Sequence, residues 1–509
     1  MHSERPADAD TDGEVASPSA APRSSMLGLH RTERRLFLRV ADLVALNSAL
    51  MLYLHARDPA GLGLSAEPAF ASLLWQQPLW FLVPTALWLI VAQAFDAYRL
   101  QIARQYLPSA AAVLKSAVVV LLLYMAIPYL TPTLPPSRRY WLILFGSTFG
   151  LLLVARGLYV LTLGRSVFRR ATLIVGAGWA GQTIAQALLE NDAGTHRIVG
   201  FVDDDAGMLD RRVPVPAADA NGAQLTSIDA QASRVLGTRD DLKSLVRRHR
   251  IRTLVLAVTD ELDPELFRIL TDSLELGVEI VPMSRLYEQI TGRVPVEHVG
   301  GDWHLAMPLE HPGTGTLQPM LKRVFDILAA SFGLLMLAPF LPLIALAIRL
   351  ESPGPIFYTQ RRIGRGGRLF RVFKFRSMQR DAEEGDAVWS QARDPRVTKV
   401  GKILRASHVD EFPQFLNILR GEMSAVGPRP ERPEFLERLA ADIPFYTVRH
   451  AVKPGMAGWA LVNCGYGSSM ADALRKLQYD LYYIKHQSVA LDIVIILKTV
   501  LHSLGLQGR

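Results

Sequence analysis

Two adjacent carboxylates, Asp410 and Glu411, precede an apolar run with helical spacing. A proline is tolerated only in the first turn of a helix, so Pro413 places Asp410 at or near the N-cap. One interpretation is therefore structural: Asp410 caps the helix, and Glu411 complements the helix dipole. The other interpretation is chemical, because a carboxylate can attack a phosphoryl group and a pair of carboxylates can hold a divalent cation beside phosphates.

The charges around the two acids favour the chemical interpretation. Arginines are dense in the segment before them, and an alternating stretch of aromatic and basic residues carries Lys374 and Arg376. Alternation of this kind predicts a strand with both basic side chains on one face. After the helix, the sequence Gly-Pro-Arg-Pro predicts a stiff turn that presents Arg429, and a guanidinium suits bidentate recognition of a phosphate. We therefore predict a phosphate-binding site around the two acids.

Five blocks of residues, taken in order, resemble the catalytic core of the bacterial monotopic phosphoglycosyl transferases. The similarity is greatest to their polyprenyl-phosphate hexose-1-phosphate transferase branch. The blocks are Lys374-Phe-Arg-Ser-Met378, Asp410-Glu-Phe-Pro-Gln414, Gly421-Glu-Met-Ser424, Val426-Gly-Pro-Arg-Pro430 and Lys453-Pro-Gly-Met-Ala-Gly-Trp459. The resemblance covers residues 320–509 closely. The chain departs from the family at Ala457-Gly-Trp-Ala-Leu461, where members often carry Thr-Gly-Trp-Ala-Gln.

The resemblance implies a sugar-1-phosphate transferase that works through a covalent intermediate. Asp410 would attack the β-phosphate of a UDP-hexose and release UMP, and undecaprenyl phosphate would then attack the phospho-sugar on Asp410. The product would be an undecaprenyl-diphosphate sugar, made in the first membrane step of exopolysaccharide or capsule synthesis. Glu411 would hold Mg²⁺, which neutralises charge on the transferred phosphoryl group. The residues expected to bind phosphates or substrate are Lys374, Arg376, Gln414, Pro428, Arg429 and Lys453.

The composition agrees with a membrane protein that handles phosphates. Half of the 509 residues are hydrophobic, and the net charge is +8. Such a chain fits a partner at a membrane surface or a polyphosphate, and we expect no nucleic acid. The single cysteine, Cys464, excludes an internal disulfide and a cysteine-based zinc site. We expect a homodimer in the bacterial inner membrane.

The elements that must position this chemistry divide the chain into segments of different character. The predicted fold class is a membrane α-helical bundle, a Rossmann-like α/β domain and a mixed α/β monotopic catalytic domain with a re-entrant membrane helix. The expected segments are a disordered tail at 1–28, four transmembrane helices in 29–165, the Rossmann-like domain at 166–300, a linker at 301–319 and the catalytic domain at 320–509. The tail is rich in Ala, Pro, Ser and Asp and lacks hydrophobic periodicity.

Four apolar spans each approach the roughly 20 residues that cross a bilayer, with buried helices of a soluble protein as the alternative. They cover about 36–55, 71–94, 110–130 and 140–163. The first span is the weakest because Arg39 and Asp42 interrupt it. Basic residues precede the first span, surround the loop after the second and follow the fourth, which places these three sites in the cytoplasm. They are Arg31, Arg34, Arg35, Arg99, Arg104, Lys115, Arg165, Arg169 and Arg170.

A strand over 171–175, a glycine-rich turn and a helix follow the last span, and a second strand ends at three aspartates. This order fits a dinucleotide-binding unit, in which glycines let a pyrophosphate approach the backbone and an acid binds a ribose. The residues concerned are Gly176, Gly178, Gly181 and Asp203. The alternative is a Rossmann-like scaffold that uses its glycines for packing alone.

This middle domain leaves a second function open. The chain could be a membrane nucleotide sensor, or an epimerase-like protein, that works through residues 166–300. In that case the C-terminal acids would be structural. The activity of a chain that begins near Lys322 would separate the two functions, because only a transferase would keep its activity without the first two domains.

Residues 322–350 form a fifth apolar segment, long enough to cross the bilayer as one straight helix. Pro339 and Pro342 fall in its middle, where each removes a backbone donor and favours a kink. Basic residues flank both ends, so both ends are expected in the cytoplasm. We predict a re-entrant helix-break-helix hairpin that leaves the catalytic domain on the cytoplasmic face. The run 472–509 is expected to form an amphipathic helix in the membrane interface, with core packing as the alternative.

Overall fold

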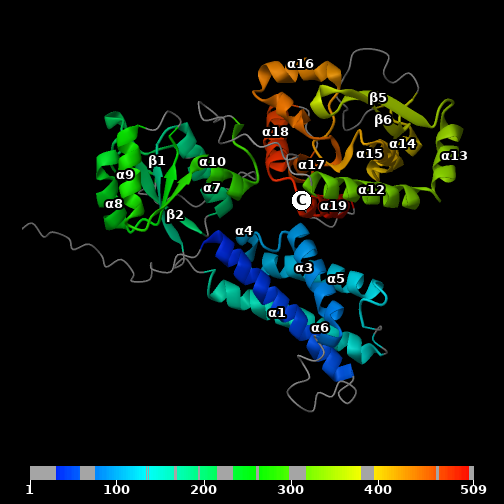
Figure 1. The fold of residues 1–509 in the computed structure, drawn as a ribbon, viewed down its shortest axis with the longest axis horizontal. Helices are drawn as coiled ribbons and strands as arrows, with labels where there is room; N and C mark the ends of the chain where they lie inside the picture. The colour runs from blue at the N-terminus through cyan, green and yellow to red at the C-terminus, as the bar shows by residue number, and fades with distance from the viewer. Residues whose placement is uncertain are drawn as a thin grey trace, which may run out of the picture.

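The structure is a computed structural model that describes residues 30–57, 75–132, 135, 137–164, 169–192, 195–214, 233–258, 263–296, 317–379, 395–465 and 469–503. Within these residues the chain forms three bodies, which are a helical bundle, an α/β domain and a larger mixed α/β domain (Figure 1). This arrangement confirms the predicted fold class. The predicted disordered tail and most of the predicted linker lie outside the described residues.

The described part of the helical bundle includes four long helices and one short helix. They are α1 (Arg31–Arg57), α3 (Pro78–Ala94), α4 (Leu100–Ala103), α5 (Tyr106–Ala126) and α6 (Arg138–Leu161). Three of them, α1, α5 and α6, are long and apolar enough to cross a membrane, whereas α3 has 17 residues. Within the described residues, the second predicted span is therefore shorter than the sequence analysis expected.

An ion pair lies inside the bundle. Asp42 of α1 and Arg156 of α6 are 2.5 Å apart, and both side chains are fully buried. The Arg156 guanidinium lies over the ring of Tyr98, whose hydroxyl accepts a hydrogen bond of 2.9 Å from Trp88. The acid that interrupts the first predicted span is thus a contact between the first and last long helices.

The α/β domain is a parallel sheet with helices on both faces. Its elements are β1 (Arg170–Val175), α7 (Trp179–Asp192), β2 (His196–Val202), η2 (Ala206–Met208), η3 (Arg239–Asp241), α8 (Leu242–His249), β3 (Thr253–Leu256), α9 (Pro264–Leu274), β4 (Glu279–Pro282) and α10 (Met283–Thr291). The strand order is β2-β1-β3-β4, and each pair is parallel. Alternate residues of β1 serve the two layers, because Leu173 packs with α8 and α9 whereas Ile174 packs with α7 and α10.

The larger domain combines short sheets with helices around a main core and a smaller apolar cluster. Its elements are α12 (Leu317–Leu337), α13 (Leu341–Glu351), β5 (Phe357–Ile363), η5 (Arg365–Gly367), β6 (Leu369–Phe375), α14 (Lys399–Ala406), η6 (Val409–Gln414), α15 (Phe415–Arg420), β7 (Ser424–Val426), α16 (Pro433–Asp442), η7 (Tyr446–Ala451), β8 (Gly455–Ala457), α17 (Trp459–Cys464), α18 (Met470–Lys485) and α19 (Val489–Ser503). The strands β5 and β6 form an antiparallel hairpin, and β7 pairs in parallel with β8. The core joins Ile418, Val426, Leu481 and Ile495, which are all buried.

The apolar helix pair at the start of this domain is broken at the two prolines. The axes of α12 and α13 are bent by 63°, and Pro339 lies in the turn between them. Pro342 lies in the first turn of α13, where a proline is tolerated. Both helices expose large apolar side chains, among them Leu321, Phe332 and Leu346. The predicted break is confirmed, and the exposed apolar surface fits contact with lipid.

The C-terminal segment forms two helices, α18 and α19. Asp492 and Ile495 of α19 are buried, and Lys498 donates to Asp96 after α3 at 2.8 Å. Figure 1 shows α19 between the bundle and the larger domain. The structure therefore favours the packing alternative for this segment.

Candidate active site

Asp410 and Glu411 lie in the short 3-10 turn η6, which leads into α15. The N-cap position of this turn is taken by His408, whose φ is +57°, and no side chain caps the turn. The interpretation of Asp410 as a helix cap is therefore wrong. Both acids are more than nine-tenths buried, and burying a carboxylate is costly unless its surroundings compensate.

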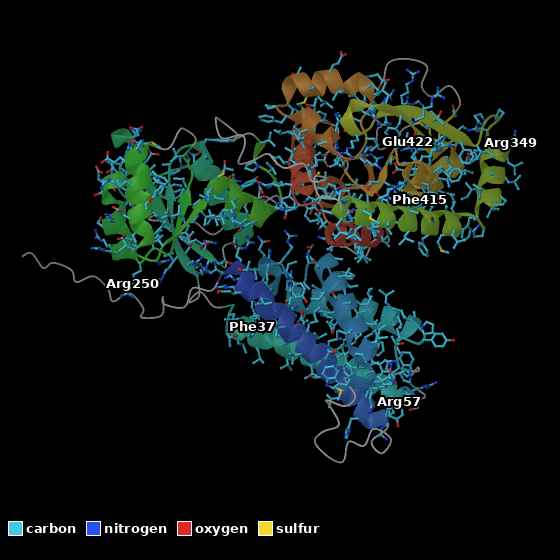
Figure 2. All side chains as sticks on the ribbon, viewed as in Figure 1. Phe37, Arg57, Arg250, Arg349, Phe415 and Glu422 are labelled. Atoms are coloured by element: carbon cyan, nitrogen blue, oxygen red, sulfur yellow. The ribbon has the colours of Figure 1, made fainter. Side chains whose placement is uncertain are left out.

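The helix α15 fixes this turn against the apolar helix α12. Phe415 of α15, labelled in Figure 2, packs on α12 so closely that a Cβ at Gly333 would lie 2.3 Å from its ring. Asn417 ties α15 to β6, because its side chain accepts from the Phe373 amide at 3.1 Å and donates to the Arg371 carbonyl at 2.7 Å. The two acids are thus positioned between the apolar helix and the basic strand.

Glu411 is held between two cations. Lys374 of β6 donates to its Oε1 atom at 2.8 Å, and Arg429 donates to the same atom at 2.7 Å. Burial alone would raise the pKa of Glu411, but Arg429 and Lys374 hold that pKa well below its usual range. The fold therefore brings together three residues from separate segments that the sequence analysis singled out, and Glu411 stays ionised.

Asp410 has a different environment. Within the described residues no group donates a hydrogen bond to its carboxylate, although Lys374, Arg405 and His408 act on it electrostatically. Burial, together with the charge of Glu411, raises the pKa of Asp410. Paired acids whose pKa values are pushed apart are typical of sites where the two groups have different roles. An uncommitted carboxylate beside basic side chains can act as a nucleophile toward a phosphoryl group.

Arg376 is placed away from this pair. It follows the last residue of β6, and its guanidinium donates to the carbonyls of Ile348 at 3.4 Å, Ser352 at 2.5 Å and Pro353 at 3.1 Å. These bonds hold the end of α13 and the segment after it. The structure therefore gives Arg376 a bracing position beside the membrane helix, and it does not bring this side chain to Glu411.

The remaining predicted binding residues form no described hydrogen bond with the two acids. Burial and the charge of Arg323, at the base of α12, lower the pKa of Lys453. Gln414 is buried at the end of η6, and the Pro428 carbonyl accepts from the Gly455 amide at 2.9 Å. Among the described contacts, none of these three side chains donates to either carboxylate.

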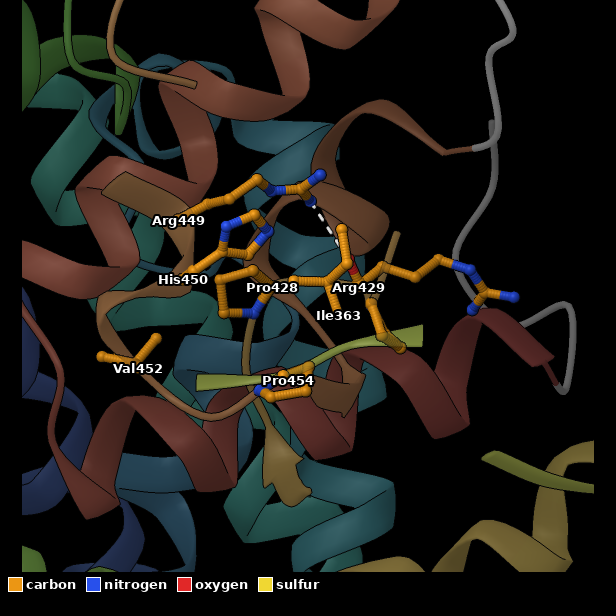
Figure 3. A pocket seen from close by; sticks show the side chains of 9 residues that line it. Ile363, Pro428, Arg429, Arg449, His450, Val452 and Pro454 are labelled. Atoms are coloured by element: carbon orange, nitrogen blue, oxygen red, sulfur yellow. Dashed lines mark hydrogen bonds between the residues drawn. The ribbon is translucent and has the colours of Figure 1, made fainter. Parts of the chain in front are cut away.

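The turn that carries Arg429 is fixed by close backbone packing. It follows β7, which pairs with β8, and a Cβ on Gly455 would lie 2.0 Å from the Gly427 nitrogen. Arg449 donates to the Arg429 carbonyl at 3.2 Å. Figure 3 shows this bond, with the Arg429 side chain pointing away from Arg449. Arg449 thus fixes the Arg429 backbone, while the Arg429 guanidinium extends in the other direction and donates to Glu411.

Sequence reasoning missed Arg449. Its buried guanidinium donates to Glu431 and Asp480, both at 2.8 Å, and to the Tyr446 hydroxyl at 2.6 Å. Burial opposes its charge, but Asp480, Tyr446 and Glu431 outweigh that effect and raise the pKa of Arg449. The available signal was an arginine shortly before a family block, which is too common a pattern to predict this role.

The donor atoms around the acids fit a hard divalent cation that also binds phosphates. Mg²⁺ in proteins commonly takes one or two carboxylates, with water and substrate phosphates as the other ligands. The Asp410 carboxylate is uncommitted, and Oε2 of Glu411 has only a long bond of 3.4 Å from Arg429. No group of three or more His, Cys, Asp or Glu side chains in the described residues could hold a metal. A bound metal would therefore need the donor phosphates to complete its ligands.

The predicted nucleotide-binding residues of the α/β domain build the turn after β1. Gly176 has a φ of +104°, and a Cβ on Gly181 would lie 2.0 Å from the Gly176 carbonyl oxygen. Asp203 accepts a hydrogen bond of 2.7 Å from the Ala177 amide, so it braces the turn. A Cβ on Gly178 would meet nothing within 4 Å, which leaves the backbone open there. The geometry combines the packing use of these glycines with room for a phosphate at Gly178.

Two family models match the chain. A model described as bacterial sugar transferase matches residues 317–505. A model described as CoA-binding domain matches residues 93–283, which include part of the helical bundle and most of the α/β domain. The catalytic blocks and the glycine turn thus fall within separate families.

Curated proteins are similar to parts of the chain. It is 40% identical to a UDP-N-acetylgalactosamine-undecaprenyl-phosphate N-acetylgalactosaminephosphotransferase of Aeromonas hydrophila, over 47% of the chain and 56% of that protein. It is 44% identical to a UDP-glucose:undecaprenyl-phosphate glucose-1-phosphate transferase of Escherichia coli K12, over 38% of the chain and 42% of that protein. It is 42% identical to the exopolysaccharide production protein PSS of Rhizobium leguminosarum bv. phaseoli, over 36% of the chain and 96% of that protein. The matches thus span about half of the first two relatives and nearly all of the third.

Proposed function

The chain belongs to the bacterial sugar transferase family, and on that premise we propose that it transfers a hexose 1-phosphate from a UDP-sugar to undecaprenyl phosphate. The observation that carries the proposal is the buried pair of Asp410 and Glu411 beside Lys374 and Arg429, which joins a nucleophile to cations that suit phosphates. The relatives' names support UDP-glucose or UDP-N-acetylgalactosamine as donor and exopolysaccharide synthesis as the process.

The proposed reaction has two displacement steps at one phosphorus. An Asp410 oxygen attacks the β-phosphorus of the UDP-sugar, and the bond from that phosphorus to the bridging oxygen breaks, so that UMP leaves. A phosphate oxygen of undecaprenyl phosphate then attacks the same phosphorus, and the Asp410 carboxylate is released. Each step exchanges one phosphorus–oxygen bond for another, so the chemistry needs no oxidant or reductant.

The residues around Asp410 are assigned separate roles in binding the donor phosphates and the metal ion. Lys374 and Arg429 hold Glu411 in place, and the Arg429 side chain, which is 40% exposed, would also donate to a phosphate of the donor. Glu411, with the donor phosphates, would hold Mg²⁺, which would supply charge neutralisation on the transferred phosphoryl group. Gln414 belongs to η6, and the Lys453 backbone packs against Gly427 just before the Arg429 turn, so we assign both residues to the walls of the site.

The test of this function is transfer by membranes that contain the full chain. UDP-glucose, UDP-galactose and UDP-N-acetylgalactosamine, each labelled in the sugar, are supplied with undecaprenyl phosphate, and label in the lipid phase is measured. We expect one of these donors to give labelled lipid together with UMP. The alternative function, a nucleotide sensor that works through the CoA-binding match, predicts nucleotide binding without lipid product with any donor.

Removal of divalent cations is expected to stop the transfer. The adjacent carboxylates provide hard oxygen ligands, and two carboxylates without a metal would repel the donor diphosphate. Excess EDTA should therefore lower the initial rate to background, and Mg²⁺ or Mn²⁺ should restore it. Full activity in EDTA would show that Lys374 and Arg429 neutralise the phosphates alone.

The acid limb of the pH–rate profile is expected to report Asp410. Attack requires the ionised carboxylate. An ordinary aspartate has a pKa of about 4, and because the pKa of Asp410 is raised, activity should already be lost at a higher pH as the pH falls. In a Glu411→Gln variant one cause of the raised pKa is gone, so the limb should move to lower pH although the rate falls. Profiles of kcat/KM between pH 4 and 9 test this, with Glu434→Gln, an exposed acid on α16, as the unshifted control. If the acid limb of the kcat/KM profile lies at the same pH in Glu411→Gln as in the unaltered protein, the limb reports a group other than Asp410.

We also propose that α12 and α13 enter and leave the membrane on the cytoplasmic face. The bend at Pro339 and the exposed apolar side chains support a helix pair that lies within one leaflet. This arrangement would keep Asp410 on the side where nucleotide sugars are made, and at the depth of a polyprenyl phosphate headgroup.

Cysteine labelling in intact cells tests that topology. In a Cys464→Ser background, a single cysteine at Ser352, just after α13, should react with a membrane-impermeant thiol reagent only after permeabilisation. A cysteine at Ser137, exposed before α6 on the opposite side of the bundle, is the positive control and should react in intact cells. Labelling of Ser352→Cys without permeabilisation would mean that the pair crosses the bilayer.

A further inference from the structure

Arginines gather where the helical bundle meets the α/β domain. We define the junction arginines as Arg31 and Arg35 of α1, Arg104 after α4 and Arg169 before β1. Arg31 lies 3.6 Å from Asp192 of α7, and burial together with the like charge of Arg104 lowers the pKa of Arg169. They lie at the edge where the parallel strands begin, which is the edge opposite the glycine turn.

The acids at this junction are too few to balance the arginines. Asp192 lies 3.6 Å from both Arg31 and His196, and Glu279 pairs with Arg170. In the part of the chain that the structure describes, no acid forms an ion pair with Arg35, Arg104 or Arg169. Because burying uncompensated charge is costly, this excess of positive charge calls for an anion.

Individual donor atoms at the junction also lack partners. The Nε and Nη1 atoms of Arg31, and the Nε atoms of Arg35, Arg104 and Arg169, are buried and make no hydrogen bond within the described residues. Buried polar groups in folded proteins are nearly always hydrogen-bonded, and a bound ion is a regular explanation for those that are not. A phosphate suits several guanidinium groups at once, because its oxygens accept bidentate bonds.

The surface beside the junction arginines carries exposed apolar side chains, and these indicate the source of the anion. Arg104 lies two residues before α5, whose first turn exposes 78% of Leu107. Tyr106 of the same turn lies beside Gly157 near the end of α6. At this end α6 exposes Leu158 and Leu161. Apolar side chains exposed next to arginines are typical of the boundary between acyl chains and headgroups.

We propose that the junction arginines bind the phosphate of an anionic phospholipid headgroup and thereby fasten the α/β domain to the membrane surface. The site is separate from the glycine turn, which lies at the other edge of the sheet, and from Asp410. The same guanidinium groups would accept inorganic phosphate, so the test must separate the lipid from the soluble anion.

The experiment measures lipid retained by the purified full chain. Native mass spectrometry in detergent is carried out with added dioleoyl phosphatidylglycerol or dioleoyl phosphatidylcholine, each with and without millimolar inorganic phosphate. We expect the anionic lipid to be retained preferentially. The Arg104→Gln, Arg169→Gln double variant should bind it about 30-fold more weakly, as expected for the loss of two interfacial arginines. Competition by inorganic phosphate that abolishes retention would assign the arginines to a soluble phosphate instead.

The control variant removes the same number of positive charges at a different place in the molecule. Arg138→Gln, Arg139→Gln alters two exposed arginines at the other end of α6, and this variant should bind the anionic lipid as the unaltered protein does. If the junction variant does not fold, Arg104→Lys, Arg169→Lys keeps the charge and should still lose part of the affinity, because lysine cannot make bidentate bonds. Equal retention of both lipids, or equal affinity in the junction and control variants, would overturn the proposal.

Discussion

The Asp410→Asn variant is expected to be inactive while its fold remains close to that of the unaltered protein. An amide has the shape of the carboxylate but cannot attack phosphorus, and no hydrogen bond within the described residues depends on the carboxylate charge. We expect transfer to fall to background, which corresponds to at least about 10³-fold, the scale on which loss of a nucleophile acts. Intact-mass measurement with donor alone should show a sugar-phosphate adduct on the unaltered chain and none on the variant.

The controls for this variant separate chemistry from folding. Asp442→Asn changes an exposed acid at the end of α16 and should leave both the rate and the adduct unchanged. The melting temperature of Asp410→Asn should equal or slightly exceed that of the unaltered chain, because it removes a charge whose pKa burial has raised. Substantial turnover by Asp410→Asn would exclude covalent catalysis at this residue.

Replacement of Arg449 by leucine is expected to have the largest effect on stability. The substitution leaves the buried Asp480 and the half-buried Glu431 without their shared cation, and loss of one partner of a buried ion pair costs about 3–5 kcal/mol. For a domain of this size, that loss would lower the melting temperature by about 6–20 °C. The Arg429 backbone also loses a hydrogen bond, so the rate should fall along with stability.

Thermal unfolding in detergent, followed by circular dichroism, measures this effect. Arg438→Leu removes an exposed arginine of α16 and should change the melting temperature by little. A third variant, Arg449→Lys, keeps the charge but loses the several donors that reach Glu431, Asp480 and the Arg429 carbonyl. Its melting temperature should therefore lie between those of Arg449→Leu and Arg438→Leu. A melting temperature of Arg449→Leu equal to that of Arg438→Leu would mean that the network contributes nothing.

The proposed reacting residues could be predicted from the sequence because their chemistry is local. Asp410 and Glu411 are neighbours, and Lys374 and Arg429 each lie in a short block with a distinctive order. The two cations meet Glu411 in the structure, but that meeting depends on the packing of β6 and of the turn after β7 around η6. Spacing alone could suggest it only through the resemblance to a family.

Other features depend on where elements end and on long-range packing. The alternation that placed Lys374 and Arg376 on one face holds only inside a strand. Because β6 ends at Phe375, the Arg376 side chain points toward α13 and bonds to the segment that follows it. The cap position could not be foreseen because it falls on His408, the residue before η6, which has a positive φ. Arg449 acquires its role from Asp480, which lies 31 residues later in the chain. No local pattern encodes such a contact.

The ion pair inside the helical bundle constrains how the protein is made. Asp42 lies in α1, and its partner Arg156 follows 114 residues later, in α6. An aspartate near the centre of a lone helix costs about 3 kcal/mol during insertion into a bilayer. We therefore expect α1 to gain its full affinity for the hydrocarbon only when α6 lies beside it. On that basis we expect α1 to stay at the translocon or at the membrane surface until α6 is present, so that the bundle is completed as a unit rather than one helix at a time.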